Sequence, residues 1–246
     1  MLLHEVHMLS ESTVIVCLSA LGALIGLCVN EVVRKLPTAL QQAWCADACE
    51  LLGLAKEDRA LYGCNARHVA GHSLLRYGFA LSASSVLTCW VVLQFGVTPK
   101  ALAALLFALG LLTVSMIDIE HMLLPDMLVL PLLWGGLLLN SLGLFTSVDD
   151  ALWGAACAYL GLIFVHVLYK RITGRDGLGL GDAKLLAAIG AWGGWQVLIG
   201  TLLVAALSSA LVILALLLTG RIKRGTLLPF GPFLALGGWL AITSTI

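Results

Sequence analysis

Charge is scarce in this sequence. Only 11% of its 246 residues are Asp, Glu, Lys or Arg, whereas 60% are hydrophobic. A soluble domain carries about a quarter charged residues, so this composition excludes a soluble fold and indicates an all-α, polytopic membrane protein in a lipid bilayer. The formal net charge is zero. Nothing in this balance points to a nucleic-acid partner.

A secretory signal peptide is also missing. The first nine residues contain no Lys or Arg, and no small-residue cleavage site follows them. We therefore predict that the first apolar segment is a permanent membrane anchor. No internal repeat or low-complexity tract is present. The prediction is one membrane domain over residues 1–246, with a cytoplasmic loop at 34–76 as its only sizeable polar segment.

Long apolar runs predict eight transmembrane helices. A helix needs about 20 apolar residues to span a bilayer, and one run near the C-terminus is too long for a single crossing. Gly193 and Gly194 lie between two tryptophans and predict a tight turn that divides this run. Without that turn the number of spans falls to seven. The predicted spans are about 12–33, 77–97, 100–117, 123–144, 150–169, 181–195, 196–219 and 227–245.

The basic residues predict the orientation. Loops rich in Lys and Arg stay in the cytoplasm. In the eight-span arrangement every Lys and Arg except Lys100 lies on one side of the membrane, with Lys184 counted at the start of its helix. Both termini are therefore predicted to be periplasmic. Asp118 and Asp182 then lie at the cytoplasmic ends of their helices.

Asp118 ends a continuous apolar span. An ionisable residue at membrane depth is costly and is a functional-site hypothesis by default. Glu120 follows at the membrane surface as a supporting or merely interfacial group. Pro125 and Asp126 suit the first turn of the next helix, where a missing N–H is harmless and a negative charge is favourable.

Asp182 follows a glycine-rich stretch, with Gly177, Gly179 and Gly181 before it. Glycines allow close backbone approach, as an extended peptide beside the carboxylate would require. A phosphate site is disfavoured, because the Walker Gly-Lys-Ser/Thr ending is absent and an acid repels an anion. Lys184 either extends to the interface or pairs with Asp182.

The two acids predict acid/base chemistry if they meet. At a separation of about 4–6 Å two carboxylates do not both ionise readily. They would hold one proton between them, so that one acts as an acid while the other activates water. This is a hypothesis, because a sequence contains no distance.

Four motifs in order resemble those of the bacterial type IV prepilin peptidases, which are GxGD intramembrane aspartyl proteases. The resemblance covers most of the chain. The motifs are Gly26–Pro37, Asp118–Asp126 with the stretch 130–135 after it, Gly179–Trp192 and Leu228–Phe233.

This resemblance implies that Asp118 and Asp182 are the catalytic pair, with Gly179 and Gly181 as active-site backbone. It implies removal of a short basic leader from type IV prepilins or pseudopilins at the cytoplasmic face of the inner membrane, after a final Gly. Glu120, Asp126 and Asp176 are weaker candidates to attract that leader. Members of the family serve pilus or secretion assembly machinery, and many methylate the new N-terminus with S-adenosylmethionine.

The sequence departs from the family's motifs in two places, within the predicted loop and directly after it. Many family members hold zinc with two Cys-x-x-Cys pairs, whereas this chain offers a different spacing: Cys45, Cys49, Cys64 and His68. Four zinc ligands or reduced thiols both fit this pattern. The family's Tyr-Pro-x-x-Glu stretch is reduced to residues 77–81, without its Pro and Glu. Methyl transfer is therefore less well supported than proteolysis.

Other classes of membrane protein remain as alternatives. A proton-coupled transporter would use the two acids as a relay, but it predicts paired interrupted helices in related halves. A non-catalytic scaffold with a metal-binding loop is a second alternative. Presenilin-like proteases share Gly-x-Gly-Asp, but their Tyr-Asp and Pro-Ala-Leu motifs do not occur here.

Overall fold

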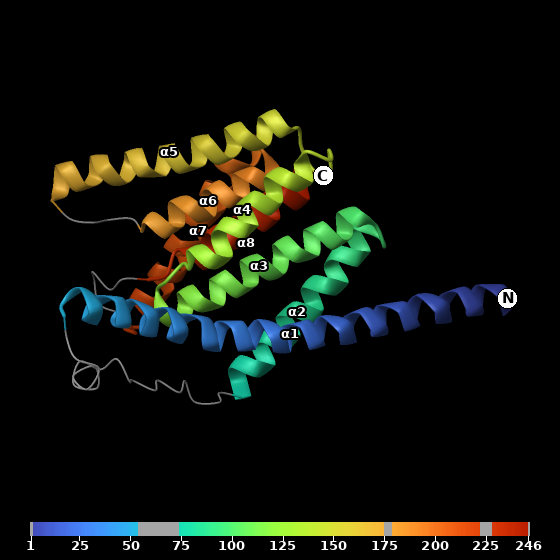
Figure 1. Ribbon diagram of the computed structural model, residues 1–246. Helices are drawn as coiled ribbons and strands as arrows, with labels where there is room; N and C mark the ends of the chain where they lie inside the picture. Colours follow the sequence, from blue (N-terminus) through green and yellow to red (C-terminus); the bar gives the residue numbers. More distant parts are fainter. Residues whose placement is uncertain (1, 54–73, 175–178, 222–227, 246) are drawn as a thin grey trace. The chain divides into compact units, whose positions relative to one another are not determined.

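The computed structural model describes residues 2–53, 74–174, 179–221 and 228–245, with side chains from Ser19 onward. The described residues form eight α-helices (Figure 1). By length and composition, α2, α3, α5 and α7 are able to cross a membrane. The predicted all-α, polytopic membrane class is therefore confirmed. The helices are α1 (Leu2–Leu51), α2 (Leu74–Phe95), α3 (Pro99–His121), α4 (Asp126–Asn140), α5 (Val148–Thr173), α6 (Leu180–Gly193), α7 (Gln196–Leu218) and α8 (Gly231–Thr245).

The predicted turn at Gly193 and Gly194 is confirmed. Helix α6 ends at Gly193 and α7 begins at Gln196. Gly194 has a φ of +79°, a left-handed conformation that side chains disfavour and glycine adopts freely. The long apolar run is thus two helices, and the number of membrane spans, eight or seven, stays a prediction.

Helix α1 is longer than the sequence predicted. It continues through Pro37 to Leu51, so residues 34–51 of the predicted loop are helical. The segment after Pro37 is rich in Ala, Leu and Gln, which have high helix propensity. Glu31 also forms ion pairs with Arg34 and Lys35 at helical spacing.

The packing divides the chain into two compact units, Met1–Gly96 and Val97–Ile246. In the first unit α1 packs against α2 through small residues. A Cβ added at Gly22 would lie 2.6 Å from Oγ1 of Thr88, and one at Gly26 would collide with Ser84. This close approach is the small-residue contact that holds membrane helices together. The single domain over 1–246 stays a prediction.

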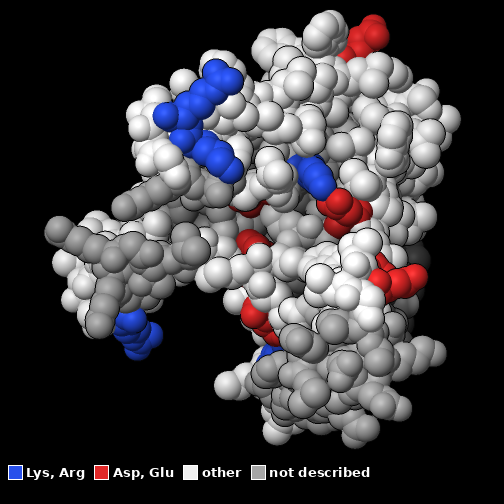
Figure 2. All heavy atoms as spheres, turned by 60° about the vertical axis from the view of Figure 1, so that its left-hand side comes forward, with Lys and Arg blue, Asp and Glu red and all other residues white. Residues whose placement is uncertain are grey.

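Helix α6 is the centre of the second unit. It packs against α4, α5, α7 and α8, and α8 in turn packs against α3. Between Asp182 and Trp192 every α6 residue except Lys184 is buried. Trp192 stacks on Phe107 of α3 at 4.7 Å and donates its Nε1–H to the carbonyl oxygen of Leu132. On the face drawn in Figure 2, few of the described side chains are basic or acidic.

Asn140 fixes the end of this unit where α6 turns into α7. Its side chain is 1% exposed and donates to the carbonyl oxygens of Ala191 and Trp192. Its Oδ1 accepts from the backbone N–H groups of Phe145 and Thr146. One buried amide therefore joins three segments.

Replacing Asn140 by alanine is expected to lower the free energy of unfolding by about 2 kcal/mol or more, because buried backbone groups lose their partners. Thermal unfolding in detergent measures this change. Ser141→Ala is the matched control, since the Ser141 hydroxyl is exposed and bonds only to Leu138 in its own helix. Equal midpoints of thermal unfolding for the two variants would contradict the inference that Asn140 joins these segments.

Candidate active site

Asp118 lies in the last turn of α3 and is 5% exposed. Its Oδ2 accepts a hydrogen bond of 2.8 Å from the backbone N–H of Gly231. Gly231 is the first residue of α8, so the carboxylate lies at the positive end of that helix. Met122 ends α3 in a left-handed conformation, with its N–H bonded to the carbonyl oxygen of Asp118.

Asp182 lies in the first turn of α6 and is 7% exposed. Its carboxylate accepts a hydrogen bond from the backbone of Gly179, the residue that precedes the helix. A negative charge in the first turn stabilises a helix, so this contact alone has a purely structural explanation. That explanation does not account for the burial of the carboxylate, because aspartates are seldom buried unless they are paired.

The structure brings the two predicted acids together at one end of the second unit. Helix α8 packs against both α3 and α6, and the charges of Asp118 and Asp182 interact. Each carboxylate accepts a hydrogen bond from a backbone N–H group at the start of a helix, and the two helices are different ones. Two buried carboxylates whose charges interact are the arrangement in which one acts as an acid and the other as a base.

The glycines beside the acids make room for Leu124. A Cβ added at Gly181 would lie 2.8 Å from Cβ of Leu124, and one at Gly231 would lie 3.2 Å from its Cδ2. The predicted close approach at Gly181 is therefore made by a side chain of the protein itself. Gly177 lies outside the described residues.

Sequence reasoning missed Gly231 and Leu124 as parts of this site. Gly231 belongs to the closing motif at 228–233, which supported the resemblance but carried no assigned role. Leu124 looked like an ordinary apolar residue at the start of a span. No signal in the sequence indicated that the closing motif contacts the acids.

Lys184 pairs with Asp126 rather than with Asp182. Its Nζ lies 2.6 and 2.7 Å from the two carboxylate oxygens of Asp126. This ion pair joins the N-terminal part of α6 to the first residue of α4. Lys184 follows Asp182 by two residues in the sequence. Glu120 remains at the end of α3, with 28% of its side chain exposed and His121 Nε2 at 3.9 Å.

Replacing Lys184 by methionine is expected to lower the free energy of unfolding by about 1 kcal/mol at most, because the ion pair is partly exposed. Lys184→Arg keeps the charge and should retain most of the stability. Thermal unfolding of the purified variants in detergent measures both changes, and equal losses in the two variants would contradict a role for the charge.

The predicted zinc ligands are only partly within the described structure. Cys64 and His68 lie outside the described residues, and Cys45 is disulfide-bonded. A disulfide sulfur is not the thiolate that zinc requires. The described chain contains no group of three or more metal-ligating side chains. Zinc binding stays a prediction, and no step is assigned to a metal.

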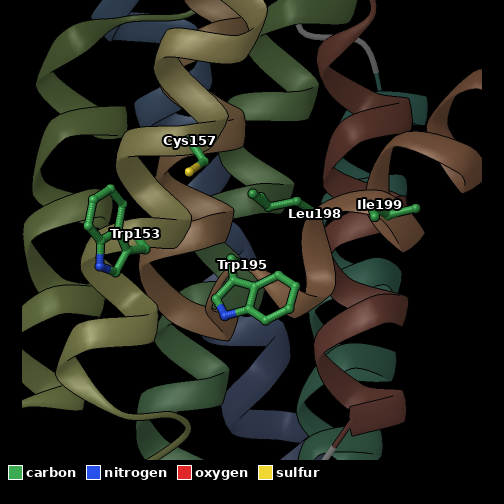
Figure 3. A pocket seen from close by; sticks show the side chains of 5 residues that line it. All are labelled: Trp153, Cys157, Trp195, Leu198 and Ile199. Carbon is green, nitrogen blue, oxygen red and sulfur yellow. The ribbon is translucent and has the colours of Figure 1, made fainter.

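An apolar pocket lies at the opposite end of the second unit (Figure 3). It has a volume of about 410 Å³ and is formed by α5, α7 and the turn before α7. It contains no acid or base beyond a cysteine thiol, so it does not compete with the acid pair as a catalytic site. Its lining residues are Trp153, Cys157, Trp195, Leu198 and Ile199.

Fold and site together define a polytopic helical membrane protein with a buried pair of aspartates at one end. A family model described as the type IV leader peptidase family matches residues 105–214. The chain is 41% identical to a prepilin leader peptidase/N-methyltransferase of Pseudomonas aeruginosa, over 93% of this chain and 89% of that relative. It is 40% identical to a protein of the same name from Stutzerimonas stutzeri, over 93% and 90%.

The chain therefore belongs to the type IV leader peptidase family. A shorter match joins it to a prepilin leader peptidase/N-methyltransferase of Aeromonas hydrophila, 44% identical over 68% of this chain and 58% of that protein. No solved structure matches the chain. The resemblance inferred from four motifs is thus confirmed by comparison over nearly the whole length.

Proposed function

We propose that this chain is a membrane-embedded aspartic endopeptidase that removes the basic leader from type IV prepilins or pilin-like secretion subunits. The observation that carries the proposal is the pair Asp118 and Asp182. Both are buried, their charges interact, and each is oriented by a backbone N–H at a helix start. Family membership supplies the class of substrate.

The chemistry follows from two carboxylates that share one proton. The unprotonated carboxylate takes a proton from water, and the water oxygen attacks the scissile carbonyl carbon. The protonated partner stabilises the developing oxyanion and then supplies a proton to the leaving nitrogen. The carbon–nitrogen bond breaks, and a leader carboxylate and a new N-terminal amine leave. The protonation belongs to the pair rather than to either residue.

The proposed orientation places the acid pair at the cytoplasmic face of a bacterial inner membrane and both termini in the periplasm. Lys170 and Arg171 lie in the last turn of α5, and Asp182 lies in the first turn of the next helix, α6. The basic residues and Asp182 therefore adjoin the same connection between two helices. Basic segments stay in the cytoplasm. A basic leader would remain there too while its apolar helix enters the membrane.

Glu120 is the remaining described candidate to attract the basic leader. Asp126 is already bonded to Lys184, and Asp176 lies outside the described residues. Glu120 is part-exposed at the end of α3, two residues after Asp118. Pilus or secretion assembly machinery would receive the processed product.

Leader removal from a purified prepilin tests the proposal. Membranes that contain the chain should convert the prepilin to a shorter product, and mass spectrometry should place the new N-terminus after the leader's final Gly. Membranes without the chain serve as the control. Failure to shorten any prepilin would favour the transporter or scaffold alternatives.

Methylation of the new N-terminus is a second candidate activity, favoured by the relatives' names. S-adenosylmethionine would supply the methyl group. At the family's Tyr-Pro-x-x-Glu position this chain has Tyr77, whose hydroxyl donates to Glu31 of α1 at 3.4 Å. These residues do not match the family pattern, so no step is assigned to them. Product mass with and without S-adenosylmethionine should differ by one methyl group if the activity is retained.

A further inference from the structure

The apolar pocket between α5 and α7 is a groove in the surface of the second unit (Figure 3). Its volume of about 410 Å³ lies within the range of ligand pockets, about 300–1,000 Å³. Trp153, Trp195 and Ile199 line it and are each more than half exposed. Since α5 and α7 are both able to cross a membrane, these exposed apolar side chains contact lipid tails rather than water.

The groove is polar at one end and apolar along the rest of its length. Asp150, Trp153 and Cys157 follow one another in α5 at spacings of three and four residues, so they share one face of the helix. Cys157 lies about 10 Å further along the helix than Asp150, at 1.5 Å per residue. On the other side, Leu198 and Ile199 lie in the first turn of α7. The acid therefore lies where both helices begin, and the apolar lining continues from there.

Asp150 holds a carboxylate beside one of the tryptophans of the groove. Its Oδ1 accepts the indole N–H of Trp195 at 2.9 Å, and its Oδ2 accepts the hydroxyl of Ser147 at 2.8 Å. The side chain of Gln196 is a third donor. A carboxylate has about four acceptor positions, so one remains for a further donor. An ammonium group suits this place, because it is attracted both by a carboxylate and by the face of an indole.

We propose that this groove binds a phospholipid whose headgroup carries a primary ammonium. The ammonium lies beside Asp150 and Trp195, and one acyl chain follows the apolar lining past Cys157. A phospholipid has its headgroup at the membrane surface and its chains directed inward, and the groove has the same order of polar and apolar parts. A headgroup that is anionic and lacks an amine is repelled by the carboxylate. The groove therefore selects the lipid by its headgroup.

A second groove on α2, in the first unit, provides a matched control. Its volume is about 350 Å³. It also combines a tryptophan, a cysteine and aliphatic side chains, but its polar lining residue is a neutral amide. Filling this groove should therefore leave the headgroup preference unchanged. Its lining residues are Val86, Cys89, Trp90, Leu93 and Gln94.

Native mass spectrometry of the purified full chain measures the preference. Equal amounts of phosphatidylethanolamine and phosphatidylglycerol with identical acyl chains are added in detergent, and the two lipid-bound masses are compared. The ratio should be about five in favour of phosphatidylethanolamine in wild type. It should fall to near one in Asp150→Asn and in Cys157→Phe, which fills the groove. Cys89→Phe and Asp149→Asn should keep the wild-type ratio, because Trp195 donates its single N–H to Asp150 and not to Asp149.

A ratio near one in wild type would overturn the proposal, and so would an unchanged ratio in Asp150→Asn or Cys157→Phe. Equal losses in Asp149→Asn and Asp150→Asn would also overturn it, because the preference would then reflect the net charge of this end of the unit. A two-chain mass that Cys157→Phe abolishes would show instead that a second copy of the chain covers the groove. If Asp150→Asn does not fold, Cys157→Phe and Cys89→Phe decide. These measurements do not depend on the proposed peptidase function.

Discussion

Replacing Asp118 or Asp182 by asparagine is expected to lower the rate of leader removal by about 10³-fold or more. Asparagine keeps the shape and the hydrogen bond from Gly231 or Gly179, but it neither accepts the proton of water nor shares one with its partner. Each single variant should lose as much activity as the double variant, since the two groups act as one unit. Initial rates on a purified prepilin measure the loss.

Asp149→Asn is the control for this pair of variants, because Asp149 is exposed in the first turn of α5. It should leave the rate unchanged. The active-site variants should also be no less stable than wild type, because a buried carboxylate costs more than a buried amide. Cleavage that survives either active-site substitution would eliminate the paired-acid mechanism, whereas a lower melting temperature in both would suggest a structural role.

Replacing Gly231 by alanine should have the second-largest effect, a loss of about 100-fold in the rate of cleavage, which is the scale expected for an ångström-size misplacement of a catalytic group. The added Cβ would lie 2.7 Å from Oδ2 and 3.2 Å from Cγ of Asp118. The carboxylate or α8 has to shift. Rates at saturating substrate measure the effect, because positioning acts on the chemical step.

Gly161→Ala provides the matched control. Gly161 lies within α5, and a Cβ there would meet no atom within 4 Å. This variant should retain full activity and gain stability, by up to about 1 kcal/mol, since alanine favours the helix over glycine. Full activity in Gly231→Ala would mean that the hydrogen bond to Asp118 does not position the carboxylate.

The sequence allowed the acids and the helices to be predicted because both features are local. Asp118 is conspicuous where an apolar run ends, and the adjacent glycines at 193 and 194 mark a turn within a long apolar run. Helix lengths were harder to predict. The extension of α1 to Leu51 depends on helix propensity in a polar segment, where hydropathy contains no signal.

The remaining contacts of the site are remote in sequence. Gly231 lies 113 residues from Asp118, and Lys184 lies 58 residues from Asp126. The charge of Lys184 suggested a nearby partner. Asp182 lies two residues before it and so does not face it on the helix, whereas Asp126 at the start of α4 lies within 2.6 Å. Such pairings depend on helix packing, which a single sequence does not specify.

Helix α6 is too short to cross a bilayer on its own. Its 14 residues correspond to about 21 Å at 1.5 Å per residue, against a hydrocarbon core of about 30 Å. Helices α4 and α8, with 15 residues each, are almost equally short, and both pack against α6. Asp182 lies in the first turn of this short helix, which neighbouring helices enclose. We therefore expect a water molecule to reach the acids along a path shorter than the full thickness of a bilayer.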